Sequence, residues 1–228
     1  MLAVEALPPT SGVRACPSLR TRAVAASIRA KGGRAVAIAA HVGDPDAIGR
    51  LVDGAVQQCG GIDIVVNNAA TNPVFGPLLD CDAGAFQKIY DVNVRGPLLL
   101  CQRAFPHLVA RGGGALVQIA SIGGITPEPG LGIYSTSKAA LISLSKAMAL
   151  EWGGAGIRSN VICPGLTKTR FAEAIWSDEH MANVAVGTQP IARVAEPDEI
   201  AGMALFLASP ASSYCTGGVY PVDGGHTT

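Results

Sequence analysis

The stretch Ala115–Lys138, ALVQIASIGGITPEPGLGIYSTSK, joins an apolar run to a loop rich in glycine and proline and then to the start of a helical pattern. The run before Ser121 is typical of a buried strand, and residues 134–152 carry a broad apolar stripe at helical spacing. A strand end followed by a glycine-rich loop is where an open α/β sheet builds its site. We therefore expect the functional centre in this stretch.

Two polar residues of the stretch, Tyr134 and Lys138, are four positions apart and so share one face of the predicted helix. An ammonium beside a phenol favours the phenolate and lowers the phenol's pKa from about 10. A useful shift requires roughly 3–4 kcal/mol from the pairing. The same spacing also occurs where a solvated lysine lies beside a half-buried tyrosine. Ser121, thirteen residues before the tyrosine at the strand end, favours the catalytic interpretation.

The rest of the chain alternates apolar runs with helical patterns. Helices are predicted at residues 21–31, 45–59, 83–110, 134–152 and 196–207, and strands at residues 34–42, 62–67, 115–121, 157–163 and 218–223. Asp44 and Pro45 supply a cap and a first residue for the second helix, and the long third helix should bend at Gly96–Pro97. Nearly continuous apolar strands between helices indicate an α/β fold with a parallel sheet covered on both faces.

Composition excludes several classes of protein. Of the 228 residues 49% are apolar and 15% charged, with 17 basic and 17 acidic residues, which argues for a folded domain and against a nucleic-acid or membrane-surface partner. No apolar run reaches 18 residues, so no membrane span is expected. The six cysteines lack zinc or C-x-x-C spacing and are interpreted as reduced core residues of a cytoplasmic protein. The four scattered histidines predict no metal site.

Residues 1–22 form an atypical segment, and residues 23–228 form the predicted domain. Leu2–Leu7 could make a short strand, but the three prolines after it break any longer element. Several arginines and few acids faintly suggest a transit peptide, yet no amphipathic helix or secretory apolar region is present.

Five motifs in order resemble the short-chain dehydrogenase/reductase family over residues 23–228. They are the N-N-A-A sequence from Asn67, Asn93 in D-V-N-V-R-G, the set Ser121, Tyr134 and Lys138, the P-G-L-T-K-T sequence from Pro164, and V-D-G-G at residues 222–225. The sequence near Asn72 and Trp176 is similar to that of carbonyl-reductase and 3-oxoacyl-reductase members. The resemblance implies a single Rossmann-like, doubly wound parallel sheet, incomplete at its N-terminus.

The resemblance also implies an NAD(P)-dependent oxidoreductase acting on a carbonyl or secondary alcohol. Tyr134 would be the general acid and base, Ser121 would hydrogen-bond the reacting oxygen, and Asn93 would hold a water behind Lys138. The implied cofactor-binding residues are His41, Val42, Asn68, Ala69, Tyr134, Lys138, Pro164, Gly165, Thr167 and Thr169. The implied cofactor is NADP or NAD. The residue that sets the preference between them, after the family's second strand, cannot be identified in this sequence.

These residues also have structural interpretations. Asn93 could be a buried amide that staples the helix bend, Asn68 and Ala69 could form a strand-to-loop turn, and the two threonines could cap a helix. The substrate loop at residues 166–195 contains Phe171 and Trp176, which suggests an apolar or aromatic carbonyl compound. The helices at residues 83–110 and 134–152 would form a homodimer or homotetramer.

The sequence departs from the family at its beginning. The usual strand and T-G-x-x-x-G-x-G loop are missing, and the fragment Thr10–Gly12 has no further glycine nearby. Such glycines allow close backbone approach to a pyrophosphate. We also expect an exposed sheet edge beside residues 62–67. His41 stands where the family usually has Asp or Asn. The alternative to an enzyme is therefore a catalytically impaired chain that acts as an interaction or oligomer subunit.

Overall fold

The computed structural model describes residues 17–228. Its sheet has four parallel strands in the order β1-β2-β3-β4, namely β1 (Ile64–Asn67), β2 (Gly114–Ile119), β3 (Ile157–Pro164) and β4 (Val219–Val222). The register pairs Asn67 with Gln118 and Ile119 with Ile162. The carboxyl ends of three strands therefore meet at one edge of the sheet, and the predicted α/β parallel architecture is confirmed.

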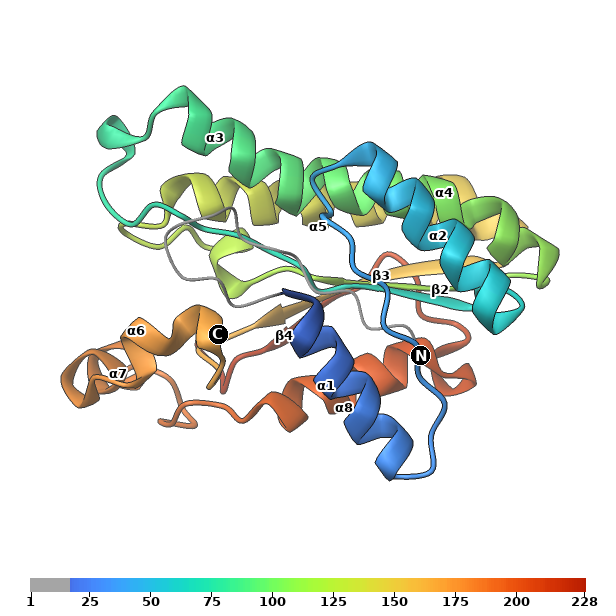
Figure 1. Cartoon of the computed structure of the whole chain (residues 1–228). Helices are drawn as coiled ribbons and strands as arrows, with labels where there is room; N and C mark the ends of the chain where they lie inside the picture. The colour runs from blue at the N-terminus through green and yellow to red at the C-terminus, as the bar shows by residue number, and fades with distance from the viewer. Residues whose placement is uncertain (1–16) are drawn as a thin grey trace.

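Helices cover both faces of the sheet (Figure 1). One face carries α2 (Pro45–Cys59), α3 (Ala83–Tyr90), α4 (Gly96–Ala110) and α5 (Gly132–Trp152), and the other carries α1 (Pro17–Ala30) and α8 (Pro197–Ala208), with the short α6 (Glu173–Trp176) and α7 (Glu179–Val186) beyond one end. Short 3-10 turns lie at Leu78–Asp80, Ile122–Gly124, Gly153–Ala155, Arg170–Ala172 and Pro210–Ser212.

Each helix layer is attached to the sheet by its own apolar cluster. Ile48 of α2, Leu100 of α4 and Leu116 of β2 are buried in the larger cluster, whereas Val117 of β2 packs with Ile162 and Leu207 on the opposite side. Adjacent residues of β2 thus serve opposite cores, as expected for a strand whose side chains alternate between faces. This arrangement fixes the ends of β2 and β3, where the residues of the predicted site would have to lie.

Local sequence signals account for two helix boundaries. Asp44 Oδ1 accepts from the backbone N of Asp46 at 2.9 Å, and Pro45 opens α2, as predicted. The long helix of residues 83–110 is interrupted by a π-helical turn, Asp91–Arg95, immediately before Gly96. The interruption lies next to the bend predicted at Gly96–Pro97, and the turn buries Asn93 completely.

The prediction of a strand at residues 34–42 is wrong. Ala40 and Val42 are buried and Ile38 packs against the larger core, so the apolar run is satisfied by packing. It forms no ladder, because β1 ends the sheet and no strand among the described residues pairs with its outer edge. β1 itself is only half-buried, since Ile64 and Val66 are 45% and 38% exposed. Among residues 17–228 the outer edge of β1 is therefore unpaired, as expected from the sequence, and one of its faces is partly uncovered.

The interpretation of the cysteines as core residues is only partly right. Cys101 and Cys163 are buried, Cys81 and Cys215 are half-buried, and Cys59 is exposed. Cys59 is at the exposed end of α2, and Cys81 and Cys215 lie in loops, where the chain is near the surface. Cys16, Leu2–Leu7 and the Thr10–Gly12 fragment lie outside the described residues. Within residues 17–228, no helix combines the length and apolarity required to cross a bilayer.

Gly96 is required by a close backbone approach. A Cβ built on Gly96 would lie 2.3 Å from the carbonyl oxygen of Val42. We expect Gly96→Ala to lower the free energy of unfolding by about 1–3 kcal/mol, measured by urea denaturation, because two backbone segments must separate. Gly49→Ala in α2 is the matched control, since nothing lies within 4 Å of its Cβ position. It should raise stability by about 0.4–1 kcal/mol. Equal effects of the two variants would contradict the close approach.

Candidate active site

The candidate site lies where β1, β2 and β3 end. Residues 68–71 follow β1, Ser121 follows β2, and Gly165 follows β3, so the parallel register brings all three segments to one edge. The first turns of α5 cover this edge and supply Tyr134 and Lys138, both of which are buried. Binding sites of open parallel sheets are built at this position.

Ser121, Tyr134 and Lys138 converge as the sequence predicts. The phenol of Tyr134 lies close enough to the side chain of Ser121 for that hydroxyl to lower its pKa. The Nζ of Lys138 lies 5.6 Å from the centroid of the Tyr134 ring, which places both side chains on one face of α5. The same ammonium donates to the backbone oxygen of Ile119 at 2.8 Å. Because that carbonyl belongs to the last residue of β2, the lysine ties the helix to the strand end.

The electrostatic expectation for Tyr134 is wrong in this structure. Burial raises the pKa of the phenol, and the nearby Ser121 hydroxyl only partly offsets this. Burial also lowers the pKa of Lys138 to about 8. Desolvation is the largest cause of both shifts, and the lysine is not among the groups that shift the pKa of the phenol. Tyr134, Ser121 and Lys138 are placed as proton transfer requires, but Lys138 alone does not lower the pKa of the Tyr134 phenol.

The buried lysine gives a testable pH dependence. Its folded-state pKa of about 8 is below the ordinary 10.5, so between these values the unfolded chain holds the proton that the folded chain has lost. Stability attributable to this group therefore rises with pH across that window, by at most about 1.4 kcal/mol per pH unit.

The measurement is urea unfolding of the wild type and Lys138→Met at pH 7 and pH 9. We expect the wild type to gain stability relative to the variant at the higher pH. The buried thiols titrate in both proteins and cancel in the comparison. Parallel pH profiles would show that Lys138 is not a buried ammonium.

Asn93 clamps the loop after β1 to α5. Its Oδ1 accepts from the N of Thr71 at 2.8 Å, and its Nδ2 donates to the O of Thr71 and to Ser137 Oγ, both at 3.0 Å. Ser137 Oγ in turn donates to the backbone oxygen of Tyr134 at 2.7 Å. These bonds join the loop after β1 to α5 and do not cross the helix bend, so Asn93 is a buried clamp, and its part in a water relay stays a prediction. Only one lone pair of Oδ1 remains for the proposed water.

The other predicted cofactor residues lie in three places: after β3, after β1, and at the end of the run at residues 34–42. Thr167 is buried and donates to the backbone oxygen of Gly165 at 3.0 Å, close to the end of β3, whereas Thr169 is exposed. Asn68 is exposed and Ala69 is half-buried in the loop after β1. The remaining positions lie at the end of the 34–42 run or beside β3: His41, whose Nδ1 accepts from the N of Gly43 at 3.2 Å, buried Val42 and half-buried Pro164.

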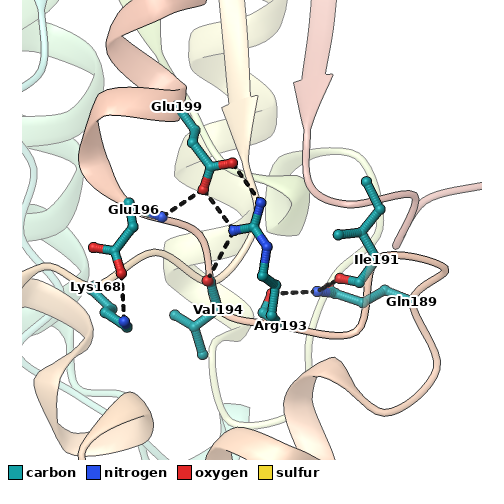
Figure 2. Close-up of polar contacts among 7 residues, drawn as sticks. All are labelled: Lys168, Gln189, Ile191, Arg193, Val194, Glu196 and Glu199. Carbon is teal, nitrogen blue, oxygen red and sulfur yellow. Dashed lines mark hydrogen bonds and ion pairs between the residues drawn. The ribbon is translucent and has the colours of Figure 1, made fainter.

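The loop at residues 166–195 is fixed at its base. Figure 2 shows Arg193 donating to both carboxylate oxygens of Glu199 at 2.6 and 2.7 Å, Lys168 paired with Glu196, and Gln189 donating to two backbone oxygens. A parallel bridge also joins Thr167 to Ala195. The Arg193 guanidinium holds the pKa of Glu199 low, at about 2. The two ends of the loop therefore lie together. We call the residues between them, 168–194, which include α6 and α7, the flap.

The flap bears directly on the site. The ring of Phe171 lies 5.6 Å from the ring of Tyr134, tilted by 36°. An aromatic side chain beside the phenol excludes water from it and gives the site an apolar wall. This contact agrees with the apolar or aromatic compound expected from the sequence.

Several residues of the site were not recognisable from the sequence. Ser137 and Thr71 complete the Asn93 clamp, and Cys163 at the end of β3 lies near Lys138, with burial raising the pKa of its thiol to about 11. Asn67 donates to Gln118 Oε1 at 2.9 Å and lies next to buried Cys101. These contacts join residues far apart in the chain, so no spacing signal indicates them. The Ser137 position, three residues after Tyr134, is the one local hint.

The nicotinamide end of a dinucleotide fits the residues present. Lys138 has three N–H donors, and among the described residues it has one acceptor, so two donors remain for ribose hydroxyls. Residues 17–228 contain no group of three or more His, Cys, Asp or Glu side chains suited to a metal ion.

Comparisons with known proteins agree with this geometry. The family model described as Enoyl-(Acyl carrier protein) reductase matches residues 16–227. Dehydrogenase/reductase SDR family member 4 of Oryctolagus cuniculus is 42% identical over 204 residues, which cover 90% of this chain and 78% of the relative.

Two solved structures extend the comparison. A putative gluconate dehydrogenase from Agrobacterium tumefaciens is 27% identical with a TM-score of 0.88, covering 98% of this chain and 84% of that one. A gluconate 5-dehydrogenase from Burkholderia cenocepacia, in complex with NADP and tartrate, is 30% identical with a TM-score of 0.85, covering 90% of this chain and 80% of that one.

The alternative of a non-enzymatic subunit gains no support from these relatives, which are named as dehydrogenases and reductases. The match to the family model spans almost the whole sequence, and the parallel sheet and the convergence of Ser121, Tyr134 and Lys138 are those that the resemblance implied. The chain therefore belongs to the short-chain dehydrogenase/reductase family, oxidoreductases that act on alcohol and carbonyl groups.

Proposed function

We propose that the chain reduces a carbonyl compound, or oxidises the corresponding secondary alcohol, with NADP or NAD, and that Tyr134 transfers the proton. The observation that carries this proposal is the convergence of Tyr134, Ser121 and Lys138 at the end of β2, behind the aromatic wall of Phe171. A nicotinamide dinucleotide bound at this edge would supply or accept the hydride.

The chain's own residues account for the rest of the chemistry. The Tyr134 hydroxyl donates its proton to the oxygen of the substrate carbonyl, and Ser121 hydrogen-bonds the same oxygen as negative charge develops there. Lys138 stabilises the resulting phenolate and holds ribose hydroxyls with its free donors. A proton then returns to Tyr134 through a water that donates to the free lone pair of Asn93 Oδ1. In the oxidising direction each transfer reverses.

The remaining predicted cofactor residues have proposed places along the same edge. Thr167 and Thr169, with Pro164 and Gly165, would line the carboxamide and pyrophosphate side. Asn68 and Ala69 would line the adenosine ribose, and His41 and Val42 would lie near the adenine. The complex of a related gluconate 5-dehydrogenase with NADP supports a nicotinamide cofactor, while the choice between NADP and NAD stays open.

We also propose a homodimer or homotetramer formed through α3, α4 and α5. Exposed apolar side chains on these helices support it, notably Phe86 at 42%, Val109 at 43% and Leu150 at 87%. Light scattering of the purified protein tests the assembly, and a monomer at micromolar concentration would overturn it. A cytoplasmic location stays a prediction.

The activity itself is tested by incubating the purified protein with NADPH or NADH and a panel of aliphatic and aromatic ketones. We expect ketone-dependent loss of the reduced-nicotinamide absorbance. A folded protein that oxidises neither cofactor with any ketone, and reduces neither oxidised form with the matching alcohols, would overturn the proposal.

A further inference from the structure

A rigid loop places a carboxylate over the site. Glu128 lies between Pro127 and Pro129, which fix their own φ angles and restrict the glutamate to extended backbone. The N of Glu128 donates to Ser135 Oγ at 3.4 Å, and its backbone oxygen accepts from the N of Leu131 at 3.1 Å. The loop is therefore attached to the first turn of α5, next to Tyr134, and its side chain is presented from a constrained position.

The carboxylate points back toward Ser121. A Cβ built on Gly123 would lie 2.9 Å from Glu128 Oε2, 3.1 Å from Ser135 Oγ and 3.5 Å from Ser121 Oγ. Three oxygens of different residues thus pack around the α-carbon of Gly123, where any side chain would collide with the carboxylate. One of these oxygens belongs to the hydroxyl proposed to bind the reacting carbonyl.

The carboxylate lacks a direct partner within the described residues. No hydrogen bond or ion pair from residues 17–228 reaches its oxygens; burial raises its pKa, and the charge of His226 offsets this only in part. The charge of Glu128 in turn raises the pKa of Tyr134. A half-buried carboxylate that no described residue hydrogen-bonds is stabilised when a donor or a cation of a ligand meets it. A cationic ligand group would also remove the repulsion that opposes a phenolate at Tyr134.

We propose that Glu128 forms a substrate subsite beside the reacting carbonyl, which selects compounds bearing a hydrogen-bond donor, an ammonium or a hydroxyl group, and rejects carboxylates. The subsite rests on the proposed function, because it takes Ser121 and Tyr134 as the pair that faces the substrate. It identifies Glu128 as the residue that determines specificity, and the missing side chain at Gly123 lets its carboxylate approach Ser121.

Three matched probes test the subsite: acetophenones bearing a 3-aminomethyl, a 3-hydroxymethyl or a 3-carboxylate group. Their dissociation constants for the purified full chain are measured by isothermal titration calorimetry, and kcat/KM is measured with NADPH or NADH. We expect the ammonium probe to bind at least about 10-fold more tightly than the carboxylate probe. The dissociation constant of the hydroxymethyl probe separates charge recognition from simple hydrogen bonding. A value near that of the ammonium probe indicates hydrogen bonding, and a value near that of the carboxylate probe indicates charge recognition.

Glu128→Gln should bring the two dissociation constants to within about threefold of each other, and Glu128→Asp, which withdraws the charge by one methylene, should give an intermediate ratio. Glu151→Gln, which removes an exposed charge at the far end of α5, should keep the wild-type ratio. An unchanged ratio in Glu128→Gln, or a wild type that prefers the carboxylate, would overturn the subsite.

The two proposals fail in different ways. If the binding preference depends on Glu128 but neither the probes nor any ketone or alcohol of the activity panel is turned over, the subsite stands and the proposed reaction falls. If the probes are turned over with a ratio that does not depend on Glu128, the reaction stands and the subsite falls.

Discussion

Tyr134→Phe is expected to lower carbonyl reduction by about 10²- to 10⁴-fold, the range associated with loss of a positioned general acid. The phenylalanine keeps the ring that packs 5.6 Å from Phe171 and removes only the hydroxyl that meets Ser121. The fold should therefore persist. Steady-state kinetics with NADPH or NADH and a ketone give the measurement, and circular dichroism checks the fold.

Tyr214→Phe provides the matched control, because Tyr214 is fully exposed and removed from the site. It should retain wild-type kinetics. If Tyr134→Phe turns over as fast as this control, another group donates the proton and the assignment is wrong.

Asn93→Ala is expected to be the most damaging substitution for stability. It removes three hydrogen bonds and leaves the backbone N and O of Thr71 without their partner, beside a fully buried position. A buried polar group that loses its partner costs about 1–3 kcal/mol, so we expect unfolding free energy to fall by about 2–4 kcal/mol in urea titrations. Activity should fall as well, because the clamp reaches the backbone of Tyr134 through Ser137.

Asn93→Asp separates the two roles of this residue. The aspartate keeps the size and the acceptor for the N of Thr71 but loses both donors. Because Oδ1 of the aspartate can still accept from the water, intermediate stability with turnover closer to the wild type than in Asn93→Ala would support a part in proton return. Stability equal to the wild type in both variants would contradict the clamp.

The sequence predicts the elements whose signals are local. Asp44 and Pro45 mark the start of α2, and Gly96–Pro97 mark the break in the long helix, since capping and proline effects depend on neighbouring residues alone. The pairing of Tyr134 with Lys138 follows equally from helical periodicity. These features needed no knowledge of distant contacts.

Other features depend on partners that the local sequence does not reveal. The run at residues 34–42 has the composition of a strand, but a strand also requires a neighbour to complete its hydrogen bonds, and β1 ends the sheet here. The raised pKa of Tyr134 depends on how deeply the fold buries the phenol, which periodicity cannot show. Ser137 and Thr71 could not be predicted because the Asn93 clamp joins residues 44 and 22 positions apart.

Binding of a nicotinamide dinucleotide at the end of β2 is the central claim, and a titration of the purified chain with NADPH and with NADH tests it most directly. Reduced-nicotinamide fluorescence reports on the bound ring. We predict a saturable change in fluorescence with at least one of the two, weakened in Lys138→Met, which loses the donors that face the ribose. A folded wild-type protein that binds neither dinucleotide at millimolar concentration would contradict the account.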